Sequence, residues 1–326
     1  MPAAKLAAGL GGAISMTNIP ITASPQTVSH PPMLSREARE GLTAYLFLAP
    51  NLISLGLFVV APLFAGLAIS LTDWDMMSSP TWVGAANYAG LLSDPALMLS
   101  LKVTLLYSLM VIPGGLIVSM LIALALNSDI RGLRIYQAIL FLPYVSSTVA
   151  VALAWKWIYN PQYGILNAAL RTIGLPQPDW LTDPAVAIVS VAIVSIWQTA
   201  GYNAILLMAG MRSIPKHYYE AASMDGATGW QKFWRITLPL LKPTIFFVMV
   251  TSLINSFIQS FNIIFVMTGG GPGNATKVLM FYIWENAFNF FKMGYASAIS
   301  YLLFVLLIAV TILQLRVTGR GAEEIR

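Results

Sequence analysis

The chain has 326 residues, of which 57% are hydrophobic and only 10% are charged, and its mean hydropathy is +0.73. Soluble domains carry about 25% charged residues, so this composition indicates a membrane protein. The net charge of +5 does not indicate nucleic-acid binding, because the basic residues stand beside apolar segments. The lack of cysteine excludes disulfides and thiolate metal sites, and the two histidines, His30 and His217, are too far apart in sequence to suggest another metal site.

Residues 1–40 are rich in Ala, Gly, Ser, Thr and Pro, which predicts a mostly disordered tail. A signal peptide is a weaker alternative, because no compact apolar core follows Lys5. Residues 41–318 are predicted to form one membrane domain, and residues 319–326 a short carboxy-terminal tail.

Six long apolar segments follow the tail, and a helix needs about 20 apolar residues to cross a bilayer. The chain is therefore predicted to be an all-α membrane protein with six transmembrane helices. The predicted spans are residues 44–71, 101–126, 136–158, 185–210, 243–267 and 293–316.

The distribution of Lys and Arg predicts the orientation of these spans. With the amino terminus inside, 13 of the 18 Lys and Arg residues fall on the cytoplasmic side. Cytoplasmic loops carry an excess of these residues, so both termini and the polar loop 212–242 are predicted to be cytoplasmic.

That polar loop has a distinctive order, IPKHYYEAASMDGATGWQKFWRITLPLLKP over residues 214–243. Prolines at both ends limit helix continuation, and the stretch YYEAASMDGA favours a short helix that Gly226 can end. The following GWQKFWRITLP predicts a second short amphipathic helix. Its Trp230, Phe233, Trp234 and Ile236 are predicted to lie along the membrane boundary.

The spacing of Glu220-Ala221-Ala222, Gly226 and Ile236-Thr237-Leu238-Pro239 resembles the EAA loop of the membrane subunits of binding-protein-dependent ABC importers. The resemblance implies the type I importer fold, with a coupling helix in a cleft of the ATPase. It implies that Glu220 pairs with a basic group of that ATPase. The coupling positions it carries over are Glu220, Ala221, Ala222, Asp225, Gly226, Ala227, Ile236, Leu238 and Pro239.

Several weaker motifs resemble the outer loops and last span of the sugar-type permeases of that family. They are SLTDW (70–74), GAANYAGLLSDP (84–95), YGILNAAL (163–170), DWLTDP (179–184), TGGGPGNAT (268–276), YIWENAF (282–288) and GYASAIS (294–300). This group takes up oligosaccharides, polyols or glycerol-3-phosphate. Two extra amino-terminal spans and the large outer domain of the maltose-type permease are lacking, which puts maltose itself in doubt.

The resemblance also implies the partners and the location. They are a second homologous permease, two ATPase subunits that bind ATP and Mg, an extracytoplasmic solute-binding protein, and the bacterial inner membrane. This chain would then be a non-catalytic subunit without a cofactor. Consistent with that role, the sequence has no GxxxxGK[ST] phosphate loop and no catalytic signature.

Every Asp and Glu falls in a predicted tail or loop. Ion-coupled carriers usually need ionisable groups within the membrane, so this distribution argues against a stand-alone secondary carrier, which is kept as an alternative.

Polar residues inside the fourth and fifth spans are candidates for the substrate path, because amides suit sugar hydroxyls and flat rings suit apolar sugar faces. On one helical face we expect Asn255, Gln259 and Asn262, at i, i+4 and i+7. The alternative is that these groups join neighbouring helices. The candidates are Ser195, Gln198, Tyr202, Asn203, Asn255, Gln259 and Asn262.

Overall fold

The computed structural model describes residues 36–127 and 131–319, so the predicted tails 1–35 and 320–326 lie outside the described residues. The chain divides into two compact units, Met1–Val59 and Val60–Arg326. The first unit contains helix α1 (Arg36–Leu55) and all but the last residue of the π-helical stretch Gly56–Val60 that follows it. The predicted end of the disordered tail at residue 40 is therefore wrong, because residues 36–40 already belong to α1.

The first unit exposes large apolar side chains along its helix. Phe47 is 83% exposed and Ile53 66% exposed. The apolar helical stretch Thr43–Ser70 is a candidate membrane span with none of its hydropathy window buried inside the protein. An exposed apolar surface of this length favours contact with lipid, because the chain's own polar groups do not shield it from water.

The second unit begins with α2 (Ala61–Ser70) and a short antiparallel hairpin in which Thr72 is opposite Trp82. The elements that follow, up to the polar loop, are β1 (Thr72–Asp73), β2 (Thr81–Trp82), α3 (Ala86–Leu92), α4 (Pro95–Leu126), α5 (Leu133–Val145), α6 (Thr148–Ile158), α7 (Ile165–Thr172) and α8 (Pro184–Arg212). After the loop come α12 (Lys242–Ile258), α13 (Ser260–Met267), α14 (Leu279–Trp284), a π-helical stretch Glu285–Asn289 and α15 (Met293–Gly319).

Among the described residues, four helical stretches are long and apolar enough to cross a membrane, or up to six if each of two bent pairs is one span. The four are Thr43–Ser70, Pro95–Leu126, Pro184–Arg212 and Met293–Arg316. Two of them start alike: Asp94 and Asp183 accept backbone N–H groups as helix N-caps, and a proline follows each as the first helical residue.

The predicted span 136–158 is bent, because the chain turns by 95° between α5 and α6. Pro143 lies in the last turn of α5, and Ser146 and Ser147 have extended backbone conformations. The Ser146 hydroxyl donates to the carbonyl of Leu142 at 2.9 Å, so a side chain satisfies one backbone group at this helix end.

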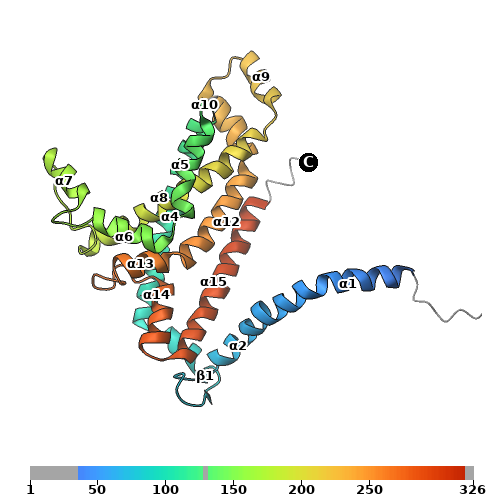
Figure 1. Cartoon of the computed structure of the whole chain (residues 1–326), viewed down its shortest axis with the longest axis vertical. Helices are drawn as coiled ribbons and strands as arrows, with labels where there is room; N and C mark the ends of the chain where they lie inside the picture. Colours follow the sequence, from blue (N-terminus) through green and yellow to red (C-terminus); the bar gives the residue numbers. More distant parts are fainter. Residues whose placement is uncertain (1–35, 128–130, 320–326) are drawn as a thin grey trace, which may run out of the picture. The chain divides into compact units, whose positions relative to one another are not determined.

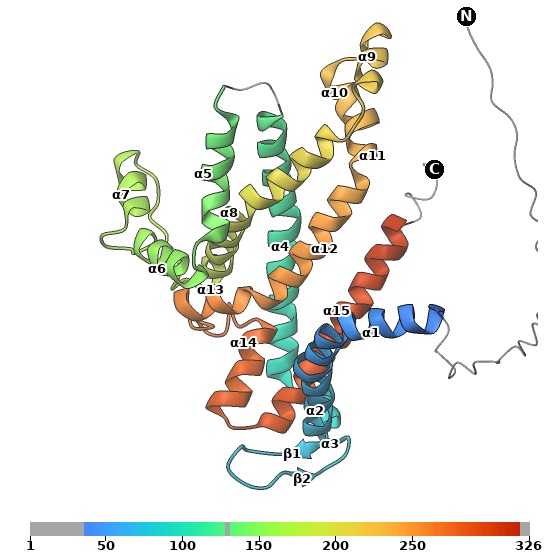
Figure 2. The same cartoon turned by 45° about the vertical axis from the view of Figure 1, so that its right-hand side comes forward.

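The predicted span 243–267 is also interrupted, because α12 ends at Ile258 and α13 begins at Ser260. Figure 2 shows α13 leaving the line of α12. Serine hydroxyls bond backbone carbonyls at this break: Ser256 donates to Leu253 at 2.9 Å and Ser260 to Phe257 at 3.2 Å. Such bonds compete with the helical ladder and favour a bend.

The core of the second unit is built on α4 and α8, which pack along each other, with α12 against α4 and α5 against α8. Three apolar clusters fill the contacts. The first joins α4, α6, α8 and α13, the second joins α4 to α14 and α15, and the third lies where α4, α8 and α12 approach the polar loop. Their fully buried members include Val191 and Ile264, Leu97 and Ile299, and Leu207 and Leu241.

The helices of the second unit place its loops at two opposite ends. The polar loop, with α9 and α10, lies at one end, and β1 and α3 lie at the other (Figures 1 and 2). The length of the helices therefore separates the polar loop from β1 and α3.

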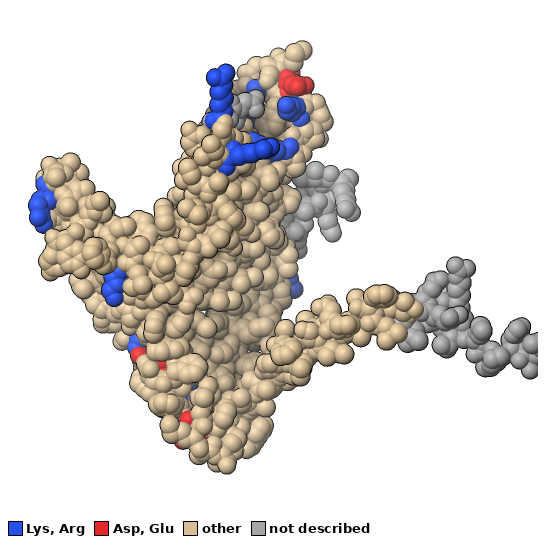
Figure 3. Space-filling view, viewed as in Figure 1, with Lys and Arg blue, Asp and Glu red and all other residues tan. Residues whose placement is uncertain are grey.

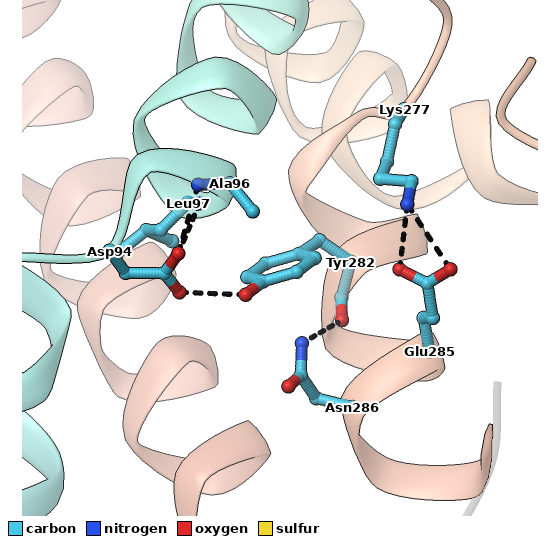
Figure 4. A network of polar contacts seen from close by, with 7 residues as sticks. All are labelled: Asp94, Ala96, Leu97, Lys277, Tyr282, Glu285 and Asn286. Atoms are coloured by element: carbon cyan, nitrogen blue, oxygen red, sulfur yellow. Dashed lines mark hydrogen bonds and ion pairs between the residues drawn. The ribbon is translucent and has the colours of Figure 1, made fainter. Parts of the chain in front are cut away.

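At that other end, one carboxylate joins three helices. Asp94 Oδ2 accepts the hydroxyls of Tyr282 and Tyr295 at 2.6 Å each, and Oδ1 accepts the backbone N–H groups of Ala96 and Leu97. Figure 4 shows Tyr282 of α14 pointing at Asp94, which precedes α4. Nearby, Lys277 Nζ lies 2.8 Å from Glu285 Oε2. Asp94 therefore fixes the start of α4 against α14 and α15.

The pKa of Asp94 reflects two opposing effects. Burial raises it, but the hydrogen bonds from Tyr282, Tyr295 and the backbone outweigh burial, so the pKa lies below the ordinary value of 3.8. Burial and the bond to Asp94 raise the pKa of Tyr282 to about 12, which keeps this hydroxyl protonated as a donor.

Replacing Asp94 by Asn should lower the thermal stability of the detergent-solubilised protein at pH 7. Because the folded-state pKa of Asp94 is lowered, its stabilisation is present above the unfolded pKa of about 4 and is lost as pH falls through the folded pKa. In melting curves from pH 7 to pH 3, the difference in melting temperature between wild type and Asp94→Asn should become smaller. A difference that is constant with pH would contradict the role of the charge.

Gly201 of α8 should resist even a methyl group. A Cβ there would lie 1.7 Å from the carbonyl oxygen of Leu140 in α5, so these backbones can approach only at a glycine. Gly201→Ala should destabilise the fold by about 1–3 kcal/mol or more, as overpacked cores do. Gly115→Ala in α4, where the added Cβ meets nothing within 4 Å, is the control. Equal melting temperatures for both variants would contradict this close packing.

Candidate functional site

The polar loop folds as two short helices joined by a tight turn. It consists of α9 (Lys216–Met224), α10 (Gly229–Lys232), a π-helical stretch Phe233–Thr237 and α11 (Leu238–Leu240). Gly226 has a φ of +75°, which brings the Ala227 N–H within 2.9 Å of the Ala222 carbonyl and closes α9.

A capping box starts α10. The Gln231 N–H donates to Thr228 Oγ1 at 3.3 Å, and the Thr228 N–H donates to Gln231 Oε1 at 2.8 Å. These reciprocal bonds satisfy two backbone donors that the new helix leaves free. The sequence GATGWQ therefore fixes the turn locally, without help from the rest of the fold.

Two side-chain bonds hold α9 against the second half of the loop. Tyr219 Oη lies 2.9 Å from Thr237 Oγ1, and Lys232 Nζ donates to Ser223 Oγ at 2.7 Å. Tyr219 and Phe233 also pack against the third apolar cluster, which contains Leu241 and Val248. The hairpin is therefore attached to the start of α12 and is not a free loop.

The predicted coupling residues fall into two groups by exposure. The exposed group is Glu220, Ala221, Asp225 and Gly226, and the half-buried group is Ala222, Ala227, Ile236, Leu238 and Pro239. Glu220 has no ion-pair partner among the residues that the structure describes. Lys and Arg side chains gather at this end of the second unit (Figure 3).

An open cleft of about 400 Å³ lies between α9 and the second half of the loop. Its lining combines small side chains with both signs of charge: Ala222, Asp225, Gly226, Ala227, Gln231, Lys232, Arg235 and Ile236. The hairpin therefore presents the exposed Glu220 of α9 beside a notch that carries Asp225, Lys232 and Arg235.

A second polar site lies between α4, α8 and α12. It is a cavity of about 30 Å³ that contains no charged residue in its lining. The lining residues are Tyr107, Val111, Tyr144, Ser195, Gln198, Thr199, Tyr202, Asn203, Ser252, Asn255, Ser256, Gln259, Ser260 and Ile263. Six of the seven predicted path residues are thus brought together.

Asn262 is not among them. It is exposed and belongs to α13, beyond the break at Gln259. The predicted i, i+4, i+7 face is therefore wrong for its last member, because the break changes the helical register after Gln259.

The buried members of the site bond to one another across helices. Tyr107 Oη lies 2.6 Å from Ser195 Oγ, Asn203 donates to Ser252 at 3.4 Å, and Gln198 donates to Thr148 at 3.3 Å. These bonds fit the reading of polar groups as contacts between helices.

The half-buried members keep part of their surface exposed. Tyr144 and Tyr202 stack with their rings 4.2 Å apart, and Gln259 donates to Asn255 at 3.3 Å within one helix turn. Tyr107 and Tyr144 were missed by the sequence analysis, although each is a polar aromatic residue inside an otherwise apolar segment. That property was the signal that could have identified them.

Among the residues described, no group of three or more His, Asp or Glu side chains could hold a metal ion. Neither polar site therefore has the ligand set of a metal centre.

Known proteins resemble this chain over most of its length. Residues 115–320 match the family model described as "Binding-protein-dependent transport system inner membrane component". The sn-glycerol-3-phosphate transport system permease protein UgpA of Agrobacterium fabrum is 35% identical, over 83% of this chain and 93% of that protein. The trehalose/maltose transport system permease protein MalF of Thermococcus litoralis is 35% identical, over 88% of this chain and 96% of that protein.

A solved structure also resembles this chain. One chain of a bacterial alginate ABC transporter, crystallised in complex with an alginate pentasaccharide-bound periplasmic protein, matches with a TM-score of 0.77 and 25% identity, over 88% of this chain and 97% of that chain. The chain therefore belongs to the binding-protein-dependent transport system inner membrane components, the non-catalytic permease subunits of ABC transporters.

Proposed function

We propose that this permease imports a carbohydrate by alternating access, driven by ATPase subunits that bind its α9–α10 hairpin. One observation carries the proposal: the same helix, α12, is packed against the hairpin at its first turns and lines the polar cavity at its last turns. Val248 lies in the cluster that receives Tyr219 and Phe233, whereas Asn255 and Ser256 line the cavity. Movement of the hairpin would therefore reach the cavity through one rigid element.

In this proposal, α9 enters a cleft of an ATPase subunit and Glu220 pairs with a basic group there. Asp225 and the small residues Ala221, Ala222, Gly226 and Ala227 permit close approach. The half-buried Ile236, Leu238 and Pro239 join the hairpin to the membrane domain. ATP binding would close two such ATPase subunits and move α9, switching the path from inward-facing to outward-facing.

A second, homologous permease is proposed to complete the path. The cavity within this chain has about 30 Å³, whereas ligand pockets commonly enclose several hundred. One chain therefore supplies a polar wall and not a complete sugar site. An extracytoplasmic binding protein would deliver the solute, as the periplasmic protein bound to the alginate transporter suggests by analogy.

A carbohydrate is the favoured solute because the cavity combines amides and hydroxyls with the stacked rings of Tyr144 and Tyr202. The related trehalose/maltose and alginate transporters support this class. The alternative is glycerol-3-phosphate, the solute named for the UgpA relative. No Lys or Arg lines the described cavity, which favours a neutral sugar over a phosphate.

The proposed location is the bacterial cytoplasmic membrane with both termini in the cytoplasm, where the hairpin could reach an ATPase. Mild-detergent purification of the tagged chain from native membranes tests the whole assignment. Recovery of an ATPase, a second permease and a binding protein would support it, and screening that binding protein would identify the solute. A chain that purifies alone and transports alone in vesicles would instead support the stand-alone carrier.

Glu220→Lys should abolish uptake while membrane insertion and the melting temperature stay unchanged. The residue is exposed, so the fold does not depend on it, whereas like charges at an interface cost several kcal/mol. Uptake and co-purified ATPase are measured together. Asp179→Lys, which reverses an exposed charge in the loop before α8, is the control and should leave the co-purified ATPase unchanged. Normal uptake by Glu220→Lys would exclude the coupling role.

Asn255→Leu should raise the half-saturating solute concentration of the complete transporter about 2- to 10-fold, equivalent to one lost hydrogen bond of about 0.5–1.5 kcal/mol. The matched control is Asn262→Leu. Both residues lie on the predicted polar face, but only Asn255 lines the cavity. Equal effects of the two substitutions on concentration-dependent uptake would place the path elsewhere.

A further inference from the structure

The second half of the hairpin has a surface that the ATPase contact does not explain. Trp230 is 71% exposed and Trp234 is 49% exposed, and their rings meet edge to face at 5.5 Å. Phe233, beside them, packs into the third apolar cluster. The two rings form one contiguous exposed apolar surface, and such surfaces mark contacts with a partner or a membrane.

The orientation of the segment Gly229–Leu240 limits which partner the two tryptophans can contact. The stretch Gly229–Leu240 meets Lys242–Ile258 at an angle of 66°. Because α12 continues into the apolar part of the chain, a segment inclined this steeply to it lies closer to the membrane plane than to the membrane normal. Tryptophan is enriched at that depth, where its amphipathic ring suits the headgroup layer.

The tryptophans also face away from α9. The cleft shared with α9 is lined by Gln231, Lys232, Arg235 and Ile236, and neither tryptophan borders it. Residues four apart share a helical face, so Trp230 and Trp234 lie together, next to the core-facing Phe233. The hairpin can therefore hold one partner with α9 and another with the tryptophan face.

Charge identifies the second partner as a membrane. The sequence GWQKFWRITLPLLK, residues 229–242, contains three basic residues and no acidic one. Lys242 is exposed at the start of α12, whereas Lys232 and Arg235 border the cleft shared with α9. Tryptophan on one face with lysine and arginine beside it is the pattern of helices that bind anionic lipid surfaces.

We propose that Gly229–Leu240 and the following Lys242 form a membrane-surface anchor, with Trp230 and Trp234 inserted among the headgroups and Lys242 bound to the phosphates of anionic phospholipids. The anchor fixes the second half of the hairpin while α9 moves with its partner. A push on α9 is thereby converted into a tilt of α12 instead of a displacement of the whole hairpin. The conversion of a push on α9 into a tilt of α12 depends on the proposed function, whereas the contact of Trp230 and Trp234 with the membrane does not.

The first test is fluorescence quenching of the complete transporter in vesicles of phosphatidylcholine and phosphatidylglycerol with chains brominated near the headgroup. The emission of Trp230 and Trp234 is obtained as the difference between wild type and the W230F/W234F variant. Trp74→Phe, in the loop that joins β1 and β2 at the opposite end, is the matched control. Phenylalanine keeps the apolar ring, so folding should be preserved.

We expect the brominated lipid to remove most of the Trp230 and Trp234 emission, with the ATPase present or absent. Emission that is insensitive to the brominated lipid would overturn the anchor. Quenching that disappears when the ATPase binds would assign the tryptophans to the ATPase and also overturn it. The measurement needs neither ATP nor a solute, so failure of the anchor is distinguishable from failure of the proposed importer.

The second test varies the fraction of phosphatidylglycerol while uptake is measured. Wild type should gain uptake several-fold as the anionic lipid increases, and Lys242→Gln should lose most of that gain. Arg171→Gln is the control, because Arg171 is exposed on α7 and contacts Gln177 far from the hairpin. An equal lipid response of all three proteins would contradict the role of the basic residues.

Discussion

The packing of α4 along α8 is the contact on which both polar sites depend. Midway along it, Tyr107 of α4 meets Ser195 of α8 in a hydrogen bond of 2.6 Å, which sets one wall of the cavity. At the Arg212 end, α8 leads directly into the α9 hairpin, and α12 returns from that hairpin to pack on α4. A shift between α4 and α8 would therefore change the cavity and the hairpin together.

The sequence predicted those parts of the structure that depend on neighbouring residues in the chain. The long spans follow from uninterrupted apolar runs, and the turn of the hairpin follows from Gly226 and the Thr228 capping box. The break near Ser146 has a sequence signal in Pro143, which favours a kink. The break at Gln259 could not be predicted, because serine hydroxyls bonded to carbonyls leave no periodic signal. Asn262 was misplaced for the same reason, and Tyr144 was missed because its stacking partner Tyr202 comes from another helix.

The two ends of the second unit are stabilised in different ways. At one end the Asp94 carboxylate, held by four donors, binds three helices through short charge-assisted hydrogen bonds, and the Lys277–Glu285 ion pair lies nearby. At the other end the hairpin is held by two side-chain bonds and by apolar packing. A stiff end and a more adaptable one are consistent with the proposal that movements start at the hairpin, because strain is transmitted through rigid elements and absorbed at the softer contacts.

The break between α12 and α13 has a consequence for water. Backbone groups at a helix end are tolerated at membrane depth only inside protein or beside a water-filled space, and this end opens onto the cavity lined by Gln259 and Ser260. A volume of about 30 Å³ admits about one or two water molecules. The break between α12 and α13 therefore lies where polar side chains and a few water molecules can satisfy its backbone groups.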